Sequence, residues 1–324
     1  MYTFDQLQEL FNDSFDLSKI PLTPLRLYDP IRYSLSQGGK RMRPLLVLMS
    51  CDLFSGYIYD AMNCAIAVEV FHNFTLLHDD IMDQSPIRRG VDTVYKKWDT
   101  SVAILSGDTM FALAYDYITR SRPEMLPRIL PLFTQTAREV CEGQQIDMDF
   151  EETDGVSIEE YTEMIRLKTA VLPAACLKLG ALFARASEKD CSLTYSFGLN
   201  IGLAFQIKDD LLDVYGDQDI FGKRTGNDIL TNKKTWLYLR ALEKAEWKDK
   251  EVLLHYYSGK HFEIDQKIAT ITGIYDKLKI REEAEALMQE YNDKALADLD
   301  AISAPDERKE IIREFALALN VRNL

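Results

Sequence analysis

Helical periodicity of apolar residues is the feature that most restricts what this chain of 324 residues can fold into. In the segment 61–82 the apolar side chains recur at roughly helical spacing, for example at Ala65, Val68 and Phe71. The same periodicity extends over further segments, namely 101–120, 126–142, 158–185, 193–215, 234–246, 263–278 and 281–302. No convincing alternating strands flanked by Asn-Gly or Asp-Gly turns occur. The sequence therefore predicts an all-α fold of about ten or more helices, with some of them buried on most sides.

No linker rich in serine and glycine divides the chain. Its length suits either one large domain or two ordinary ones, and we expect a single domain over residues 1–324. The clearest interruption is the segment 154–157, which predicts a loop between two helices. Ser157 is the expected N-cap of the helix that follows this loop.

Charge and composition exclude several classes of function. The net charge of -14 argues against non-specific binding to nucleic acid or to an anionic membrane surface. The longest apolar run, Leu45 to Met49, is far too short to span a bilayer, and residues 1–15 lack the basic start of a signal peptide. The five cysteines form no C-x-x-C pair, which is typical of reduced thiols. We expect a cytoplasmic protein that binds no nucleic acid and has no stable membrane insertion.

Two aspartate clusters of the form D-D-x-x-D each close an apolar helical run. Their members are Asp79, Asp80 and Asp83 in the first cluster, and Asp209, Asp210 and Asp213 in the second. Residues four apart share one helix face, where like charges cost roughly 0.2–0.5 kcal/mol per exposed pair. A cation removes this cost, and Mg²⁺ is typically held by one or two carboxylates together with phosphate oxygens. One such cluster is explained equally well as a solvated acidic face, but two copies favour a metal site.

Basic residues near the first cluster suit a phosphate-bearing substrate. The run from Gly38 to Pro44 has glycines that end one helix and a proline suited to the first turn of the next. Within this run Lys40 and Arg43 can reach one anion. Arg88 and Arg89 follow the first cluster closely and project in different directions, so that they can bind two different phosphate groups.

Other basic residues are more scattered along the chain. His72 lies two helical turns before Asp79 and on the same face, which favours a functional role over a structural one. Four lysines complete the set of candidates: Lys168, Lys223, Lys233 and Lys234. Of the basic residues, Arg41 and Lys234 are best interpreted as ordinary surface charges.

In order and spacing these residues resemble the trans-isoprenyl diphosphate synthases, or polyprenyl synthetases, over residues 35–240. The resemblance also takes in Gly143-Gln144, Asp147, Lys168-Thr169, Phe205-Gln206, Gly222-Lys223 and Asp228. It implies antiparallel helices around a deep central cavity, usually in a homodimer. The implied reaction is the Mg²⁺-dependent, head-to-tail condensation of isopentenyl diphosphate with allylic diphosphates.

The resemblance also implies a role for individual residues. Asp79, Asp83 and Asp209 would hold about three Mg²⁺ per active site, with Mn²⁺ as an alternative metal, and Asp80, Asp210 and Asp213 would contribute more weakly or indirectly. The residues implied to bind isopentenyl diphosphate are Lys40, Arg43, His72 and Arg89, in a segment that includes Gly39. Those implied to hold the allylic diphosphate are Arg88, Lys168, Lys223 and Lys233. The backbone of Thr169 and the side chain of Gln206 would face the developing carbocation, beside Lys168.

The implied chemistry follows from charge. Metals and basic groups would neutralise the leaving diphosphate, and an apolar cavity would exclude water from the carbocation. In the family the diphosphate that leaves takes the proton, so no side-chain base is expected. The resemblance also implies that the residues four and five before the first cluster set the floor of the product tunnel. Here they are Thr75 and Phe74, which favours short products of about C15–C20 and geranylgeranyl diphosphate in particular.

Several alternatives stay open at this point. A longer-chain polyprenyl diphosphate synthase has the same motifs, and a non-catalytic partner subunit of such an enzyme has the same fold. A terpene cyclase usually replaces the second D-D-x-x-D and lacks the basic set. An acidic cation-binding protein needs no basic set at all. Two departures from the family are Asp92, where a Lys-Pro pair is frequent, and a C-terminus with only one basic residue, Arg322.

Overall fold

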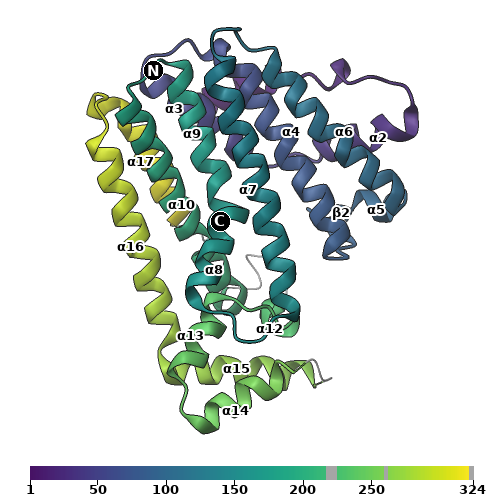
Figure 1. Ribbon diagram of the computed structural model, residues 1–324, viewed down its shortest axis with the longest axis vertical. Coiled ribbons are helices and arrows are strands. Elements are labelled where there is room, and N and C mark those ends of the chain that lie inside the picture. Colours follow the sequence, from purple (N-terminus) through teal and green to yellow (C-terminus); the bar gives the residue numbers. More distant parts are fainter. Residues whose placement is uncertain (217–224, 259–261, 321–324) are drawn as a thin grey trace. The chain divides into compact units, whose positions relative to one another are not determined.

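The computed structural model describes residues 1–216, 225–258 and 262–320 (Figure 1). Their contacts group them into two compact units. The first unit comprises Met1–Thr134, Ala175–Ser192 and Ser303–Ile311, and the second comprises Gln135–Ala174, Leu193–Ile302 and Ile312–Leu324. The expected single domain over residues 1–324 stays a prediction.

The first unit is built around one long, almost fully buried helix. Its own helices are α1 (Phe4–Ser14), α2 (Leu25–Ser36), α3 (Met42–Leu53), α4 (Ile58–Met82), α5 (Val94–Lys97) and α6 (Thr100–Thr119), with a 3₁₀ turn at Leu17–Lys19. Figure 1 shows α4 alongside α3 and α6, which both contact it. Because nearly every side chain from Ala61 to Phe71 is buried, α4 has the all-round apolar surface that the sequence predicts.

A small hairpin in the first unit was not predicted. Strands β1 (Ile87–Arg88) and β2 (Val91–Asp92) pair antiparallel, with Arg88 opposite Val91. The two-residue turn between them is Arg89-Gly90, with φ of 53° and 79°. Both residues need positive φ in such a turn, and Gly90 adopts it without a steric cost. The hairpin was missed because Arg-Gly is a weaker turn signal than Asn-Gly and each strand has only two residues.

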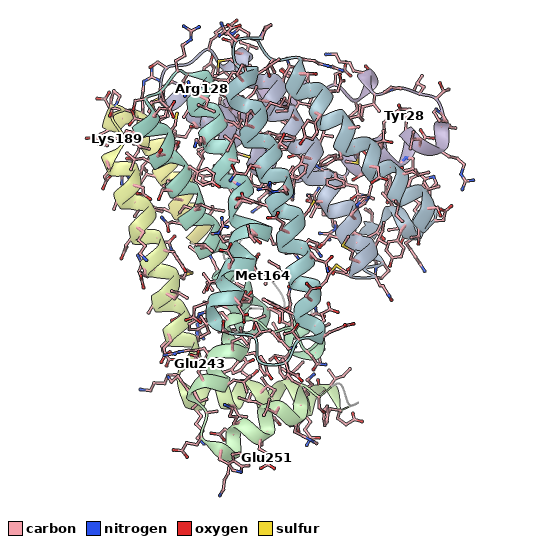
Figure 2. All side chains as sticks on the ribbon, viewed as in Figure 1. Tyr28, Arg128, Met164, Lys189, Glu243 and Glu251 are labelled. Carbon is pink, nitrogen blue, oxygen red and sulfur yellow. The ribbon has the colours of Figure 1, made fainter. Side chains whose placement is uncertain are left out.

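The second unit packs its helices around aromatic and aliphatic side chains. Its own helices are α8 (Ile158–Ile165), α12 (Asn227–Leu230), α13 (Trp236–Lys244), α14 (Trp247–Tyr256), α15 (Ile264–Leu278) and α16 (Ile280–Ala301), with a π-helical turn at Arg166–Ala170. Helix α13 contacts α8, α15 and α16, and its Leu237 belongs to a buried cluster with Tyr161 and Tyr275. In Figure 2 the buried Met164 of α8 lies in the interior, whereas Glu243 and Glu251 are exposed on α13 and α14.

Four helices contribute residues to both units. They are α7 (Leu126–Glu152), α9 (Val171–Phe183), α10 (Glu188–Tyr215) and α17 (Asp306–Asn320). Four of the five points at which the chain passes from one unit to the other therefore lie inside continuous helices, and the fifth, at Ile302–Ser303, lies between α16 and α17.

The predicted helices are confirmed with small shifts in their ends. Ser157 caps α8 through a capping box, in which its hydroxyl accepts the N–H of Glu160 and the Glu160 carboxylate accepts the N–H of Ser157. The predicted segment 126–142 continues to Glu152, because Ile146 and Phe150 still pack on the buried cluster of the second unit. The predicted segment 158–185 is interrupted by the π-helical turn, which periodicity does not reveal.

None of the helices in the described part of the chain is long and apolar enough to cross a membrane. The five cysteines are thiols rather than disulfides, and all but Cys141 are buried. Cys191, which was not placed in a helix from the sequence, lies in the first turn of α10.

The close approach of α9 and α3 gives a test of the packing in the first unit. A Cβ on Gly180 would lie 2.1 Å from the backbone oxygen of Val47, which cannot move away as a flexible side chain can. We expect Gly180→Ala to lower the free energy of unfolding by about 1–3 kcal/mol or more, measured by denaturant unfolding. The control is Gly273→Ala in α15, where a Cβ meets nothing within 4 Å. This change should raise the free energy of unfolding by about 0.4–1 kcal/mol. Equal effects of the two changes would contradict the packing.

Candidate active site

The first aspartate cluster lies at the C-terminal end of α4, where this buried helix reaches solvent. Its three carboxylates differ in exposure, because Asp80 is buried, Asp79 is half-buried and Asp83 is exposed. Asp83 ends the helix, and its N–H donates to the carbonyl oxygen of Asp79 at 2.8 Å. Asp79 and Asp83 are therefore the members that a ligand from solvent can reach, which is what their predicted role requires.

Arg88 of β1 neutralises the inner part of this cluster. Its Nε donates to Oδ1 of Asp80 at 2.6 Å, and its Nη2 donates to Oδ2 of Asp79 at 3.0 Å. Burial raises the pKa of the Asp80 carboxyl, and Arg88 opposes this shift. Arg88 thus places a positive charge beside two carboxylates of the cluster. Carboxylate oxygens are also the hard donors that fit Mg²⁺.

A metal ion at either cluster would need further ligands from a substrate. In the part of the chain that the structure describes, no three His, Cys, Asp or Glu side chains come close enough together to hold a metal ion by themselves. Mg²⁺ usually keeps few protein ligands and completes its shell with phosphate oxygens and water. The carboxylate oxygens of both clusters are hard donors of the kind that Mg²⁺ takes.

Arg89 points to a different partner from its neighbour Arg88. Its Nη1 donates to the carbonyl oxygen of Gly38, in the loop between α2 and α3. A Cβ on Gly39 would lie 3.0 Å from Cζ of Arg89, so glycine leaves room for the guanidinium. Gly38 and Gly39 also have φ of 73° and 127°, which side chains rarely adopt. The prediction that the two arginines project in different directions is confirmed.

Arg43, in the first turn of α3, contacts His72 of α4. Nη1 of Arg43 lies 2.9 Å from Nε2 of His72. Burial, followed by the charges of Arg43 and Arg89, holds the pKa of His72 well below its usual value, so the ring is neutral and Nε2 accepts. Nε of Arg43 is buried and makes no hydrogen bond to the residues described. Such a donor suits an anionic ligand, and Lys40 lies exposed in the loop between α2 and α3.

Two interpretations of basic residues were wrong. Arg41 is not a surface charge, because its side chain is only 10% exposed and forms an ion pair with the buried Glu69 of α4. Nor is Lys234 simply solvated, since its Nζ donates to the carbonyl oxygens of Phe150 and Thr153 at the end of α7. An acidic residue within the otherwise apolar run of α4 is the sequence signal that could have revealed the Arg41 partner.

The second cluster, at the end of α10, divides in a similar way. Asp209 is exposed, whereas Asp210 is 3% exposed. The Asp210 carboxylate accepts from the hydroxyl of Tyr161 at 2.5 Å, from Nε2 of Gln206 at 3.2 Å and from the N–H of Trp236 at 3.4 Å. Burial raises the pKa of Asp210 to about 7, although the Tyr161 hydrogen bond lowers it. Asp209 is therefore the member of this pair that solvent and ligands can reach.

The remaining groups near the second cluster also carry charge. Oδ2 of Asp213 accepts the N–H of Asp228 at 2.9 Å, and burial raises the pKa of Asp213 to about 6. Lys233 is exposed and close enough to lower the pKa of Asp210, Asp213 and Asp228. Lys223 lies outside the described residues.

The π-helical turn Arg166–Ala170 carries two of the predicted catalytic residues. Nζ of Lys168 forms an ion pair with Asp147 of α7. The hydroxyl of Thr169 donates to Oε1 of Gln206 at 3.0 Å. Turns of this wide type are rare and are frequently found at functional sites. The turn brings the side chains of Thr169 and Gln206 into a hydrogen bond, and their role beside a carbocation stays a prediction.

The sequence profile of the family described as polyprenyl synthetase matches residues 24–275. The chain belongs to this family. It is 37% identical to a short chain isoprenyl diphosphate synthase of Methanothermobacter thermautotrophicus, over 91% of each chain. A crystal structure of a geranylgeranyl pyrophosphate synthase superposes with a TM-score of 0.93, at 43% identity and 98% coverage of both chains. The fold is therefore the isoprenoid synthase fold that the resemblance implied.

A third similarity concerns the metal. A geranylgeranyl pyrophosphate synthase of Corynebacterium glutamicum, solved with isoprenyl diphosphate and magnesium, superposes with a TM-score of 0.87 at 29% identity. The match covers 99% of this chain and 100% of that one. As a member of this family of Mg²⁺-dependent enzymes, the chain is a prenyltransferase.

The contact between Tyr161 and Asp210 can be tested by stability alone. Tyr161→Phe removes a donor to a buried carboxylate without removing the ring, and we expect a loss of about 1–3 kcal/mol in the free energy of unfolding. Denaturant titration measures it. Tyr59→Phe, at an exposed tyrosine of α4, is the matched control and should change the stability by less than about 0.5 kcal/mol. A loss no greater than that of the control would contradict the hydrogen bond.

Proposed function

We propose that this chain condenses isopentenyl diphosphate head to tail with allylic diphosphates. The observation that carries the proposal is that a carboxylate cluster and a cationic cluster adjoin within the first unit. Arg88 contacts Asp79 and Asp80, while the adjacent Arg89 contacts Gly38 in the loop that carries Lys40 and precedes Arg43 of α3. A metal-bound diphosphate needs carboxylates on one side and basic groups on the other.

The metal is proposed to be held by the carboxylates that solvent can reach. Asp79, Asp83 and Asp209 would hold about three Mg²⁺, and Asp80, Asp210 and Asp213 would support them through the hydrogen bonds described above. When bound, Mg²⁺ would neutralise charge on the leaving diphosphate. The basic residues proposed to hold the allylic diphosphate are Arg88, Lys168 and Lys233, together with Lys223 outside the described residues.

The chain's own side chains would orient the second substrate and protect the cation. Lys40, Arg43, His72 and Arg89 would bind isopentenyl diphosphate, so that its double bond attacks the allylic carbon as the C–O bond breaks. The backbone oxygen of Thr169 and the amide oxygen of Gln206 carry partial negative charge suited to the developing carbocation.

The proton balance needs no side chain of the protein. The leaving diphosphate would take the proton that the condensed product loses, and we assign no side-chain base. A homodimer and a cytoplasmic location stay predictions.

The test of this function uses the purified chain alone with Mg²⁺, isopentenyl diphosphate and farnesyl diphosphate. We expect prenyl transfer that a chelator abolishes. Asp79→Ala and Asp209→Ala should each lower kcat by about 10²-fold or more, because each removes a proposed metal ligand. Asp116→Asn, which removes an exposed pair with Arg120, should leave kcat unchanged. A chain that is folded but inactive without a second subunit would support the partner-subunit alternative instead.

The product length depends on Phe74 and Thr75, which precede the first cluster on α4. The Phe74 ring packs against Phe111 of α6 at 5.2 Å and against Phe71 at 5.6 Å between ring centroids, so that its position is held by neighbouring aromatic rings. The hydroxyl of Thr75 donates to the carbonyl oxygen of His72 at 2.8 Å. A bulky fixed ring beside a small residue supports a floor at the length of geranylgeranyl diphosphate.

Chromatography of the products tests this proposal. The unmodified chain should give mainly the C20 diphosphate, and a product that stops at C15 or extends beyond C25 would contradict the assignment. Phe74→Ala removes the ring and should shift the main product to at least one isoprene unit longer. Tyr59→Ala, which removes an exposed aromatic ring from the same helix, is the matched control and should leave the product length unchanged.

A further inference from the structure

A buried carboxylate of α4 has no part in the reaction as described above. Glu69 is 3% exposed and lies between the buried Val68 and Val70. A carboxylate is rarely buried so completely without a partner, because the loss of hydration has to be compensated. Its contacts show which part of the proposed site depends on it.

Glu69 is held by two side chains. Nη1 of Arg41 forms an ion pair with its Oε1, and Nδ2 of Asn73 donates to the same oxygen at 2.8 Å. Nη2 of Arg41 also donates to the carbonyl oxygen of Leu35 in α2 at 2.6 Å. Arg41 therefore joins the last turn of α2 to the middle of α4, and Glu69 is the anchor of that connection.

The backbone of Arg41 needs such an anchor. Its φ and ψ are 47° and 35°, the left-handed conformation that residues with a side chain adopt only at a cost. It lies immediately before α3 and follows Gly38 and Gly39, which also have positive φ. The backbone conformation of Arg41 sets the directions in which the side chains of the preceding Lys40 and the following Arg43 project from the backbone.

The same face of α4 contacts Arg43, which follows the loop in the first turn of α3. His72 lies one helical turn after Glu69 and contacts Arg43 at 2.9 Å. Because the guanidinium of Arg41 is paired with the carboxylate of Glu69, we assign Arg41 the role of positioning its neighbours and not the role of a phosphate ligand. Burial lowers the pKa of Arg43 and Arg89, and the negative charge of Glu69 opposes this shift in both.

We propose that Glu69 is a positioning residue that sets the affinity for isopentenyl diphosphate, by holding Arg41 and thereby the loop 38–41 and the start of α3, which carries Arg43. This inference rests on the proposed function of the loop. It differs from a purely structural role because it predicts an effect on one of the two substrates and not on the other.

The experiment compares Glu69→Gln, Arg41→Gln and the double variant in the full chain. Each single change should raise the KM for isopentenyl diphosphate on the order of tenfold, the scale of one charge-assisted hydrogen bond. The KM for farnesyl diphosphate and kcat should stay within about twofold. The double variant should be no worse than either single variant, because both residues act through one contact.

The double variant also guards against misfolding, since it leaves no unpaired charge in the interior. Glu69→Asp, which keeps the carboxylate on a shorter side chain, should recover part of the affinity. Asp116→Asn is the matched control, because it removes an acidic group of the same unit from an exposed pair.

Several outcomes would overturn the inference. A fall in the thermal midpoint with both KM values unchanged would show a merely structural pair. An Arg41→Gln effect much larger than that of Glu69→Gln would show that Arg41 contacts phosphate directly. Equal changes in both KM values would remove the specificity for isopentenyl diphosphate. Failure of the proposed function is distinguishable, because the unmodified chain would then transfer no prenyl group at all.

Discussion

The arrangement of this protein depends on how it compensates carboxylates buried at the ends of apolar helices. Two adjacent aspartates at a helix end repel each other, and the inner one also loses its hydration. In the first cluster Arg88 supplies the compensating charge to Asp80. In the second, Asp210 receives the Tyr161 hydroxyl, the Gln206 amide and one backbone N–H. The same motif is therefore stabilised by an ion pair in one unit and by neutral donors in the other.

This difference separates the roles within each cluster. The second aspartate of each motif, Asp80 or Asp210, is buried and hydrogen-bonded to other protein groups. Solvent can reach the first aspartate of each motif, Asp79 or Asp209, and also Asp83, the last of the first cluster. A metal ion brought by a diphosphate then needs no rearrangement of the buried carboxylates. Arg88 contacts Asp79 as well as Asp80, so that a metal at Asp79 would compete with a guanidinium that is itself suited to phosphate. Such an exchange of one cation for another would keep the cluster neutralised before and after binding.

Most of the fold could be predicted because helices of this length repeat their apolar residues many times, and the motifs occupy helix ends. The site was predictable wherever the residues are close in the chain, as at Arg88, Arg89 and Asp79. What could not be predicted depends on contacts between distant segments or on a change of helical pitch. The π-helical turn at Lys168 has no compositional signal, and Arg41 was misread because its partner Glu69 lies on another helix.

The second unit links its aspartate cluster to the residues proposed to face the carbocation. Nε2 of Gln206 donates to Oδ1 of Asp210, so the NH₂ group of the amide faces this carboxyl group. Its amide oxygen is then directed to the Thr169 hydroxyl, which donates to it. If the amide were rotated, its oxygen would face the carboxylate and the contact with Asp210 would be lost, whereas the Thr169 hydroxyl could accept from the NH₂ group instead. Because Tyr161 and the backbone of Trp236 hold Asp210 in turn, the orientation of one neutral dipole is set by a chain of contacts that reaches into the core.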